Sequence, residues 1–341
     1  MTVHIGLIGG GNISETHARA AKAISGVAIA AIYGTNAEKV KKLSLEHGAR
    51  PYRQLDDFLR HRPMDIVTIG SPSGLHATHG IAAANHGLHV LTEKPIEISS
   101  SRARELIAAV TRSGVKLGVM FQDRAKPEIR KLKNWVDRGV LGKPLLIDAK
   151  VKWYRPAQYY AQSRWRGTFA LDGGGALINQ AIHTIDLLLW LFGDVTNVQA
   201  SVSTALHTIE GEDTVLAILQ FANGAVGSLL ASTSAFPGYP RRLEITGTEG
   251  TIVLEQDQIV SVDLKNAPTD VAPAARSTDI ESAASPVVSD YSGHKVIVED
   301  FIRAIAENGT PICDGPEGLR SISLVERIYA AAEAYRMSSK T

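Results

Sequence analysis

Residues 3–14 read VHIGLIGGGNIS, an apolar run that leads through a glycine-rich turn into a helical stretch. Gly9 allows a tight turn, and Gly11 lets the backbone approach a pyrophosphate whose charge faces the amides at a helix N-terminus. Ser14 replaces the third glycine of this pattern and is small enough for a close helix–strand contact. A glycine-rich turn in this strand–turn–helix context predicts dinucleotide binding. The residues expected at the dinucleotide here are Gly9, Gly11, Asn12 and Ile13.

The chain up to residue 121 alternates short apolar runs with amphipathic stretches of helical length. Runs such as Val27–Tyr33 and residues 66–70 are typical of parallel strands buried on both faces. Strand, helix and strand in repetition predict a doubly wound parallel sheet. We therefore expect a Rossmann domain over residues 1–121.

From residue 122 the runs become longer and alternate polar with apolar residues, as in Thr214–Phe221. Asn223-Gly224 between two such runs is a strong hairpin signal. This pattern predicts a C-terminal α+β domain over residues 122–341 with an open, mainly antiparallel sheet. An α/β protein of two domains agrees with the length of 341 residues, because one domain usually has about 100–200.

Charge and composition narrow the partners and the compartment. The 36 basic and 35 acidic residues nearly cancel, which does not favour nucleic acid or an anionic membrane. The longest apolar stretch, Ile182–Phe192, is shorter than the ~20 residues of a membrane span. A single cysteine, Cys313, cannot form an internal disulfide, and a first strand at Val3 leaves no room for a signal peptide. We expect a cytoplasmic protein with a small-molecule substrate.

The end of the second strand bears on the choice between NAD and NADP, because a carboxylate there accepts from the ribose 2′-hydroxyl of NAD. Here it reads Tyr33-Gly34-Thr35-Asn36, without an acid. Thr35, Asn36 and Lys39 can bond a 2′-phosphate, although no arginine is present to clamp one. The sequence favours NADP slightly and leaves NAD open.

Lys94 follows a further apolar run, residues 89–91, within Glu93-Lys94-Pro95. Ligands of doubly wound sheets bind at the carboxyl ends of the strands, and Pro95 restricts the backbone of Lys94. A surface lysine in a loop is the ordinary alternative. A lysine fixed beside a nicotinamide can hydrogen-bond a hydroxyl group and help it lose its proton. The cofactor contacts expected from this edge and from the strand before it are Ser71, Pro72, His76, Glu93 and Lys94.

A polar stripe marks an otherwise apolar helix predicted after Gly173-Gly174-Gly175. Helical spacing sets Asn179, His183 and Asp186 at i, i+4 and i+7 on one face. Burying such groups without partners costs about 1–3 kcal/mol each. Either they face a ligand or a structural network satisfies them, and for Asp186 both explanations stay open.

A metal centre is the competing hypothesis for a chain with 11 histidines. No His-x-x-Glu-His or similar ligand pair with a suitable carboxylate occurs along one predicted helix. His76 and His79 are three residues apart, but they lie in the dinucleotide domain. We expect no metal.

Taken together, these motifs resemble the glucose–fructose oxidoreductase / inositol dehydrogenase family (Gfo/Idh/MocA) over nearly the whole chain. The resemblance implies a Rossmann domain and a C-terminal domain whose open sheet packs against another subunit, as a homodimer or homotetramer. It also implies oxidation or reduction of a secondary alcohol of a sugar, cyclitol or sugar nucleotide with NAD or NADP. The matching pieces are residues 9–13, 71–76, 93–95, 173–175, the helix through His183, 247–251 and 300–301.

On this resemblance Lys94 and His183 are the catalytic residues: His183 accepts the hydroxyl proton, and Lys94 polarises the same oxygen. Many members carry Asp four residues before that histidine, where this chain has Asn179, which can hold a hydroxyl but cannot take a proton. A subgroup resembling sugar 3-dehydrogenases has a similar Asn-Gln-x-Ile-His run, so the change does not imply an inactive site. The residues expected to meet the substrate are Lys94, Asn179, His183, Trp165 and Tyr154.

Two other functions remain as alternatives. A catalytically silent regulatory protein of the same fold would sense dinucleotides or sugars, but it would be expected to lack Lys94 or His183. Biliverdin-type reduction needs no helix histidine. Gln122 and Arg124 follow the last strand of the first domain and are expected to face the cleft, with a salt bridge as the alternative for Arg124.

Overall fold

A computed structural model of the chain describes residues 2–266, 271 and 290–338. They form two compact units. The first unit consists of the residues up to Gln122 together with a later segment that ends at Ile322. The second unit consists of the segment that begins at Asp123 together with the residues from Ser323 onward. The sequence places the division after residue 121, and the structure gives the first unit a further segment from the C-terminal part of the chain.

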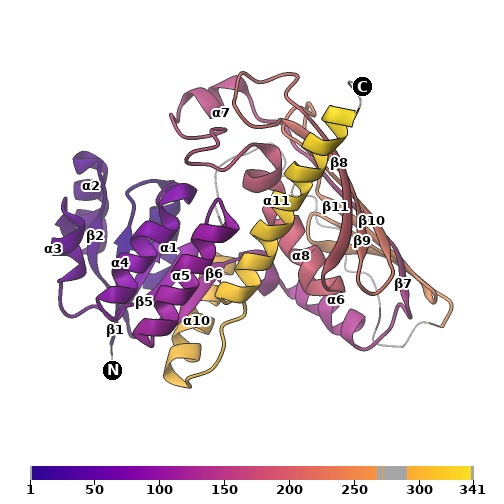
Figure 1. Ribbon diagram of the computed structural model, residues 1–341. Helices are drawn as coiled ribbons and strands as arrows, with labels where there is room; N and C mark the ends of the chain where they lie inside the picture. Colours follow the sequence, from indigo (N-terminus) through magenta and orange to yellow (C-terminus); the bar gives the residue numbers. More distant parts are fainter. Residues whose placement is uncertain (1, 267–270, 272–289, 339–341) are drawn as a thin grey trace. The chain divides into compact units, whose positions relative to one another are not determined.

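The first unit is built on a six-stranded sheet whose pairings are all parallel. Its strands are β1 (Val3–Ile8), β2 (Val27–Tyr33), β3 (Arg50–Tyr52), β4 (Ile66–Ile69), β5 (His89–Glu93) and β6 (Leu117–Met120). Its helices are α1 (Asn12–Lys22), α2 (Ala37–His47), α3 (Leu55–Leu59), η1 (Ser73–Leu75), α4 (His76–Asn85), α5 (Ser100–Ser113) and α10 (Ser292–Ala306). The doubly wound parallel sheet predicted from the sequence is confirmed (Figure 1).

The strand order β3-β2-β1-β4-β5-β6 reverses direction between β1 and β4. Open α/β sheets bind their ligands at the carboxyl ends of the strands beside such a reversal. The glycine turn follows β1, and Ser71-Pro72 follows β4. All four residues of β4 are buried, as the continuous apolar run predicts for a central strand. The topology therefore brings these predicted cofactor motifs to one edge of the sheet.

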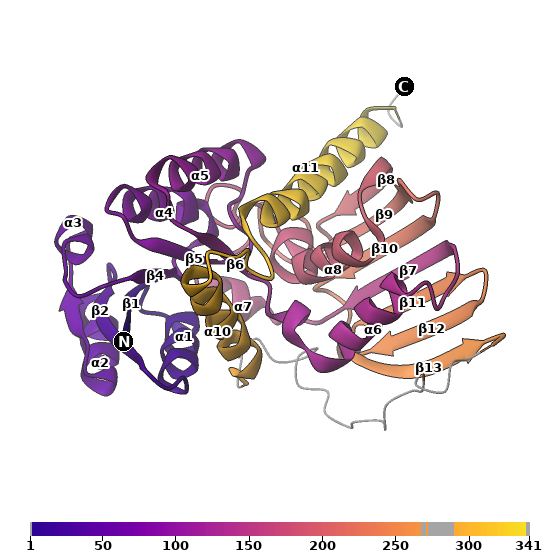
Figure 2. The ribbon, with the colours of Figure 1, turned by 90° about the horizontal axis from the view of Figure 1, so that it is seen from below.

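Helix α10 packs against α1 and completes the first unit (Figure 2). The guanidinium of Arg19 lies 4.7 Å from the centre of the Tyr291 ring. A Cβ added to Gly118 of β6 would come within 2.8 Å of the Phe301 ring, so the glycine lets α10 approach the sheet. A helix from the C-terminal part of the chain thus covers the start of the dinucleotide unit.

The second unit is built on a seven-stranded mixed sheet. Its strands are β7 (Pro144–Lys152), β8 (Val195–Ser203), β9 (Thr214–Phe221), β10 (Val226–Ser232), β11 (Arg242–Gly247), β12 (Gly250–Glu255) and β13 (Gln258–Leu264). The order is β13-β12-β11-β7-β10-β9-β8. Within the described strands β7 pairs with β10 in parallel and the other pairings are antiparallel, which confirms the open, mainly antiparallel sheet.

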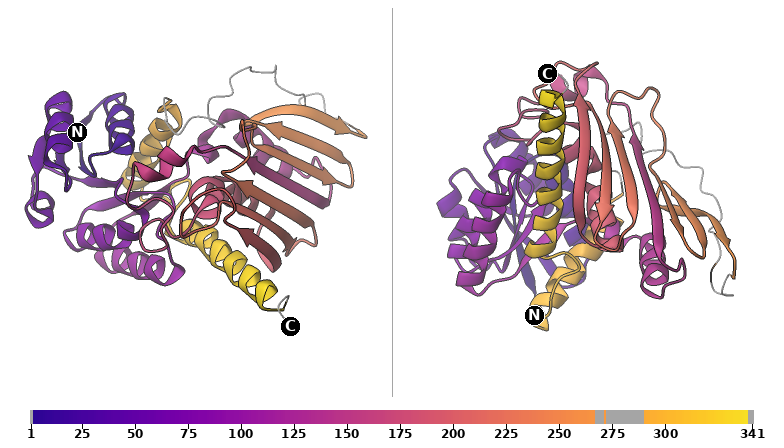
Figure 3. Two further views of the ribbon diagram at one scale, coloured as in Figure 1. Left: turned by 90° about the horizontal axis from the view of Figure 1, so that it is seen from above. Right: turned by 45° about the vertical axis from the view of Figure 1, so that its right-hand side comes forward.

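Helices lie on one face of this sheet, as Figure 3 shows. These helices are α6 (Pro127–Asp137) and α8 (Ile182–Phe192). The remaining helical segments are η2 (Gln122–Ala125), α7 (Ala157–Ala161), η3 (Ala176–Ala181) and α11 (Gly315–Ser338). Helix α11 has residues in both units, because the division falls after Ile322. Strand β9 shows why one face is covered: Val215, Ala217, Leu219 and Phe221 are buried, whereas Leu216, Ile218 and Gln220 are exposed. No helix within the described ranges is long and apolar enough to cross a membrane.

Candidate active site

The glycine turn after β1 has the geometry of an anion cradle. Gly9 has a φ of 129°, and a Cβ there would lie 2.8 Å from the Gly70 carbonyl oxygen. Among the described residues no side chain caps the N-terminus of α1, and a Cβ on Gly11 would meet no atom within 4 Å. Uncapped amides facing open space fit the pyrophosphate of a dinucleotide. Ser14 is buried against Gly9, as its role in place of the third glycine requires.

The segment after β2 differs in one detail from the expectation for the ribose end. The Asn36 side chain accepts a hydrogen bond of 3.0 Å from the Lys39 amide and so caps α2. The side-chain oxygen of Asn36 is therefore bonded to the helix, whereas Thr35 and the Lys39 side chain are exposed. The loop itself, residues 34–36, has no acid, as the sequence indicates, and the first turn of α2 carries both Glu38 and Lys39.

Two histidines of α4, buried His76 and half-buried His79, contact the loop after β4. Ser71 Oγ lies 2.9 Å from His79 Nδ1. Burial, aided by the charge of His76, lowers the pKa of His79 to about 4, so its ring is neutral near neutral pH. The His76 ring nitrogens lie 2.8 Å from the Pro95 carbonyl oxygen and 3.0 Å from that of Ser71. His76 therefore connects the loop after β4 with the loop that carries Lys94.

The sequence analysis considers His79 only as a possible metal ligand and does not predict its contact with Ser71. The three-residue spacing of His76 and His79 on α4 was the signal: it puts both rings near the same loop.

Lys94 is half-buried directly after β5. Its backbone N–H donates to Glu93 Oε2 at 3.2 Å, and the Lys94–Pro95 peptide bond is cis. With the Pro95 carbonyl held by His76, the backbone is bonded on both sides of the lysine. Gln122, the other predicted contact from this unit, packs against Gly293 at the start of α10.

In the second unit the run Gly173-Gly174-Gly175 packs against Glu212. A Cβ on Gly175 would come within 1.8 Å of the Glu212 carbonyl oxygen. The Glu212 carboxylate accepts from the amides of Gly175 at 3.2 Å and Leu177 at 2.7 Å, and from the Tyr329 hydroxyl at 2.9 Å. Burial raises the pKa of this carboxyl. The glycines let the chain pass close enough for one carboxylate to hold the start of the next helix.

That helix is not a regular α-helix throughout, which changes the spacing assumed from the sequence. Residues Ala176–Ala181 form the π-helix η3, and α8 begins only at Ile182. The α-helical i, i+4 relation therefore does not hold from Asn179 to His183, because a π-turn is wider than an α-turn. Such π segments often occur at functional sites.

The three polar side chains of the predicted stripe have three different neighbours. Asn179 Nδ2 donates to Asp172 Oδ1 at 2.6 Å, and its Oδ1 accepts from Gln180 Nε2 at 3.0 Å. His183 Nδ1 lies 3.9 Å from Asp123 Oδ2. Asp186 receives two hydrogen bonds, 2.8 and 2.7 Å long, from Arg124, and both side chains are buried. For Asp186 the structure supports the network explanation, and for Arg124 the salt bridge.

The aromatic residues predicted to meet the substrate lie near a second network. Gln180 bonds the Tyr159 hydroxyl at 3.0 Å and accepts from buried Arg155 at 3.1 Å. Tyr154 is half-buried, with its ring edge-on to Phe236 at 5.2 Å, and Trp165 is also half-buried. The sequence analysis assigns no role to Gln180 or Arg155, because the bonds that join Gln180 to Arg155 and Tyr159 span more than 20 residues of the chain.

The neighbourhood of His183 is strongly charged. Asp123 accepts from Arg241 at 2.7 Å and from Lys126 at 2.7 Å, and both cations also contact Asp257. Burial by itself would raise the pKa of the Asp123 carboxyl, but the charges of Lys126, Arg241 and His183 hold it well below its ordinary value of 3.8. An ionised carboxylate therefore faces Nδ1 of His183 and can favour the protonated imidazole.

Comparison with known proteins assigns the chain to a family. Residues 3–121 match the oxidoreductase family with an NAD-binding Rossmann fold, and residues 129–253 match the GFO/IDH/MocA C-terminal domain. The chain belongs to the Gfo/Idh/MocA family of oxidoreductases. The family resemblance and the dinucleotide-binding Rossmann fold predicted from the motifs are confirmed, and the matching family model describes this domain as NAD-binding.

Relatives match this Gfo/Idh/MocA chain over most of its length. The WlbA dehydrogenase of Bordetella pertussis, solved with NADH and UDP-GlcNAcA, is 30% identical with a TM-score of 0.89, covering 98% of this chain and 97% of its own. Levoglucosan dehydrogenase of Pseudarthrobacter phenanthrenivorans is 27% identical over 90% of each chain. D-apiose dehydrogenase of Paraburkholderia graminis is 28% identical over 97% of this chain and 88% of its own.

Replacing Asp123 by Asn should alter the pH dependence of stability. Because the folded-state pKa lies below 3.8, the ionised carboxylate stabilises the folded protein above that value and loses this effect as the pH falls through the folded-state pKa. The difference in free energy of unfolding between wild type and Asp123→Asn, measured with urea, should therefore be largest near pH ~7 and smaller below pH ~4. A difference in unfolding free energy that does not change with pH would contradict the role of the ionised Asp123 carboxylate in stability. The exposed pair of Glu333 and Arg336 offers a control, Glu333→Gln, that should shift stability by less than about 1 kcal/mol.

Proposed function

We propose that this protein is an NAD(P)-dependent dehydrogenase or reductase for a secondary alcohol or ketone of a sugar, cyclitol or sugar derivative. The observation that carries the proposal is the backbone around Lys94, at the carboxyl end of a Rossmann strand, bonded on both sides of the lysine. Family membership supports the reaction class.

The cofactor would be held by the first unit. Its pyrophosphate would meet the turn at Gly9, Gly11, Asn12 and Ile13, and its adenosine ribose would meet Thr35, Asn36 and Lys39. Ser71, Pro72, His76, Glu93, Lys94 and Gln122 complete the proposed contacts at the strand ends. Bound NAD⁺ supplies the hydride acceptor at nicotinamide C4.

In the oxidation direction His183 accepts the hydroxyl proton of the substrate. The C–H electron pair leaves as hydride, the remaining O–H electrons form the carbonyl bond, and Lys94 donates a hydrogen bond to that oxygen as its negative charge develops. The ionised Asp123 favours the imidazolium that results on His183. Asn179 cannot take a proton, and it orients a neighbouring hydroxyl instead.

The names of the relatives guide the choice of substrates. One is solved with a nucleotide sugar acid, and two others are named for levoglucosan and D-apiose. A spectrophotometric screen with NAD and NADP in parallel should therefore cover nucleotide sugars, free and anhydro sugars, sugar acids and inositols. Cofactor and sugar binding without turnover across the whole screen would favour the alternative of a silent regulatory sensor.

Replacing Lys94 or His183 by Ala should lower kcat by roughly 10²–10⁴, the usual contribution of a positioned proton-transfer group. NADH affinity, measured by fluorescence titration, should stay within a few-fold because the pyrophosphate cradle is untouched. Lys22→Ala, an exposed lysine on α1, is the matched control and should retain full activity. Unchanged turnover in Lys94→Ala would end the catalytic assignment, and full rate in His183→Ala would favour a biliverdin-type reduction.

We also propose that NADP is accepted beside NAD, because the loop at residues 34–36 after β2 has no acid and the first turn of α2 carries an exposed Lys39 beside Glu38. Asn36→Asp should keep the cap of α2, since Asp caps helices as well as Asn, while it adds a charge that repels a 2′-phosphate. The ratio of kcat/KM for NADP over that for NAD should fall by roughly tenfold or more. An unchanged ratio would show that this loop does not contact the 2′ position.

The outer face of the C-terminal sheet supports the proposal of a homodimer or homotetramer. Leu216 and Ile218 of β9 are 49% and 50% exposed, and Val226 and Leu146 lie across the neighbouring strands. An exposed apolar patch on a sheet is a common subunit interface. The double variant Leu216→Glu/Ile218→Glu should elute from a sizing column as a smaller species, whereas Gln220→Glu on the same face should not. Identical elution of all three proteins would remove this sheet face from the interface.

A further inference from the structure

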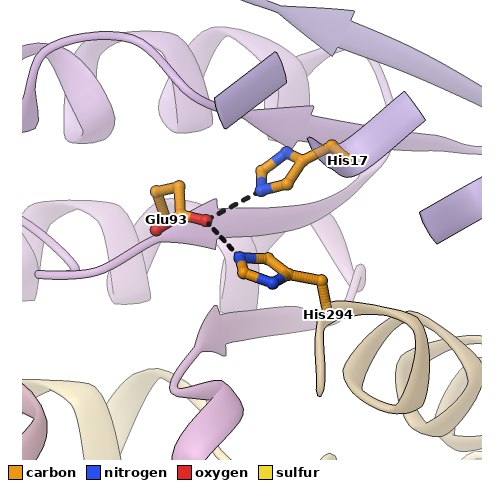
Figure 4. A group of neighbouring side chains, drawn as sticks. All are labelled: His17, Glu93 and His294. Carbon is orange, nitrogen blue, oxygen red and sulfur yellow. Dashed lines mark hydrogen bonds and ion pairs between the residues drawn. The ribbon is translucent and has the colours of Figure 1, made fainter. Parts of the chain in front are cut away.

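The carboxylate of Glu93 lies between two buried histidines from different helices (Figure 4). His17 on α1 places its Nε2 2.8 Å from Glu93 Oε1, and His294 on α10 places its Nε2 3.5 Å from the same oxygen. All three side chains belong to the first unit. We call them the Glu93 cluster.

Electrostatics keep this carboxylate ionised. Burial by itself would raise the pKa of Glu93, but the hydrogen bond from His17 and the approach of both histidine rings hold it well below its ordinary value of 4.5. A buried anion without such partners would be strongly destabilising, since desolvation of a lone charge costs several kcal/mol. The two rings therefore allow Glu93 to stay charged inside the protein.

The same three residues are also of the types that hold a metal ion. A tetrahedral zinc site separates its ligand atoms by about 3.3 Å, because each bond is about 2.0–2.2 Å long. Here His17 Nε2 and Glu93 Oε1 are 2.8 Å apart, a hydrogen-bond distance, and both ring nitrogens point at the oxygen itself. The geometry favours a hydrogen-bonded cluster over a metal centre.

The other oxygen of Glu93 connects the cluster to Lys94. Oε2 accepts the backbone N–H of Lys94 at 3.2 Å, whereas His17 and His294 approach Oε1. A carboxylate held at one oxygen presents the other in a restricted direction, so the rings on α1 and α10 restrict the side chain to which the Lys94 amide is bonded.

The buried His294 ring has few polar contacts besides Glu93 among the described residues. Within the described residues neither of its ring nitrogens has a hydrogen bond, and Glu93 is the charged group that it approaches. A buried polar group left in this way costs about 1–3 kcal/mol. A small movement of the ring would close the 3.5 Å gap to a hydrogen bond.

We propose that His17 and His294 are positioning residues for Lys94, acting through the carboxylate of Glu93. The proposal rests on the catalytic role proposed above for Lys94. It adds that a helix from the C-terminal part of the chain contributes to the placement of the amine.

The test combines kinetics with direct labelling of the lysine. Glu93→Gln keeps the shape of the side chain and removes its charge, and His294→Gln removes the second ring. Each should lower kcat by roughly 10–100-fold through misplacement of Lys94. NADH affinity should stay within a few-fold of wild type in His294→Gln, because His294 makes none of the proposed cofactor contacts. In a Lys94→Ala background the same changes should cost less than about twofold, because the residue they position is gone.

A second readout does not depend on turnover. Acetic anhydride labelling followed by peptide mass spectrometry reports the reactivity of each lysine. Both variants should change the labelling rate of Lys94 while that of Lys22 stays the same. Unchanged Lys94 labelling in both variants would overturn the proposal. A fully active Lys94→Ala protein combined with altered labelling would retain the positioning and reject the catalytic role.

A control and a metal assay complete the test. His4→Asn disrupts another histidine–carboxylate pair, with Asp65, at the opposite end of the strands, and it should change neither kcat nor Lys94 labelling. Wild type and His294→Gln are incubated with Zn²⁺, desalted and analysed for bound metal. One zinc per chain in wild type that is lost in His294→Gln would replace the positioning role with a metal site.

Discussion

An ionised carboxylate buried at the end of β5 is the constraint on which the first unit depends. Glu93 can be charged there because His17 and His294 approach one of its oxygens, and its other oxygen bonds the Lys94 amide. Removing a charge from water is expensive, so the elements that supply its partners must be in place together. A strand, the first helix of the chain and a helix from its C-terminal part meet at this one group.

The second unit also contains buried carboxylates, but their hydrogen-bond partners are of other kinds. Asp186 on α8 is fully buried and is satisfied by two hydrogen bonds from Arg124. Glu212 is buried as well, but it is held by backbone amides and by Tyr329. These interactions hold the π-helix and α8, and so they fix the segment that carries Asn179 and His183. The stability of the scaffold and the placement of the proposed catalytic side chains thus depend on the same buried polar groups.

Much of the fold could be predicted because its signals are local. Periodicity distinguishes strands buried on both faces, such as β4, from half-exposed strands, such as β9. The α-helical spacing predicted from Asn179 to His183 was wrong, because residues 176–181 form a π-helix that no local pattern in the sequence indicates. Local patterns also could not pair His79 with Ser71 or Gln180 with Tyr159, since those contacts depend on how separate segments pack.

Local patterns in the sequence were sufficient to predict the parallel Rossmann sheet, the glycine turn, the lack of an acid in the loop after β2 and the positions of Lys94 and His183 in the chain. These follow from backbone preferences and from periodic burial, which act over a few neighbouring residues. The partners of the buried charges became known from the tertiary structure alone. They are His17 and His294 for Glu93, and Arg124 for Asp186. Such pairs join residues far apart in the chain, and a charge is satisfied by whatever group folding brings within hydrogen-bond or ion-pair distance of it, at any sequence separation.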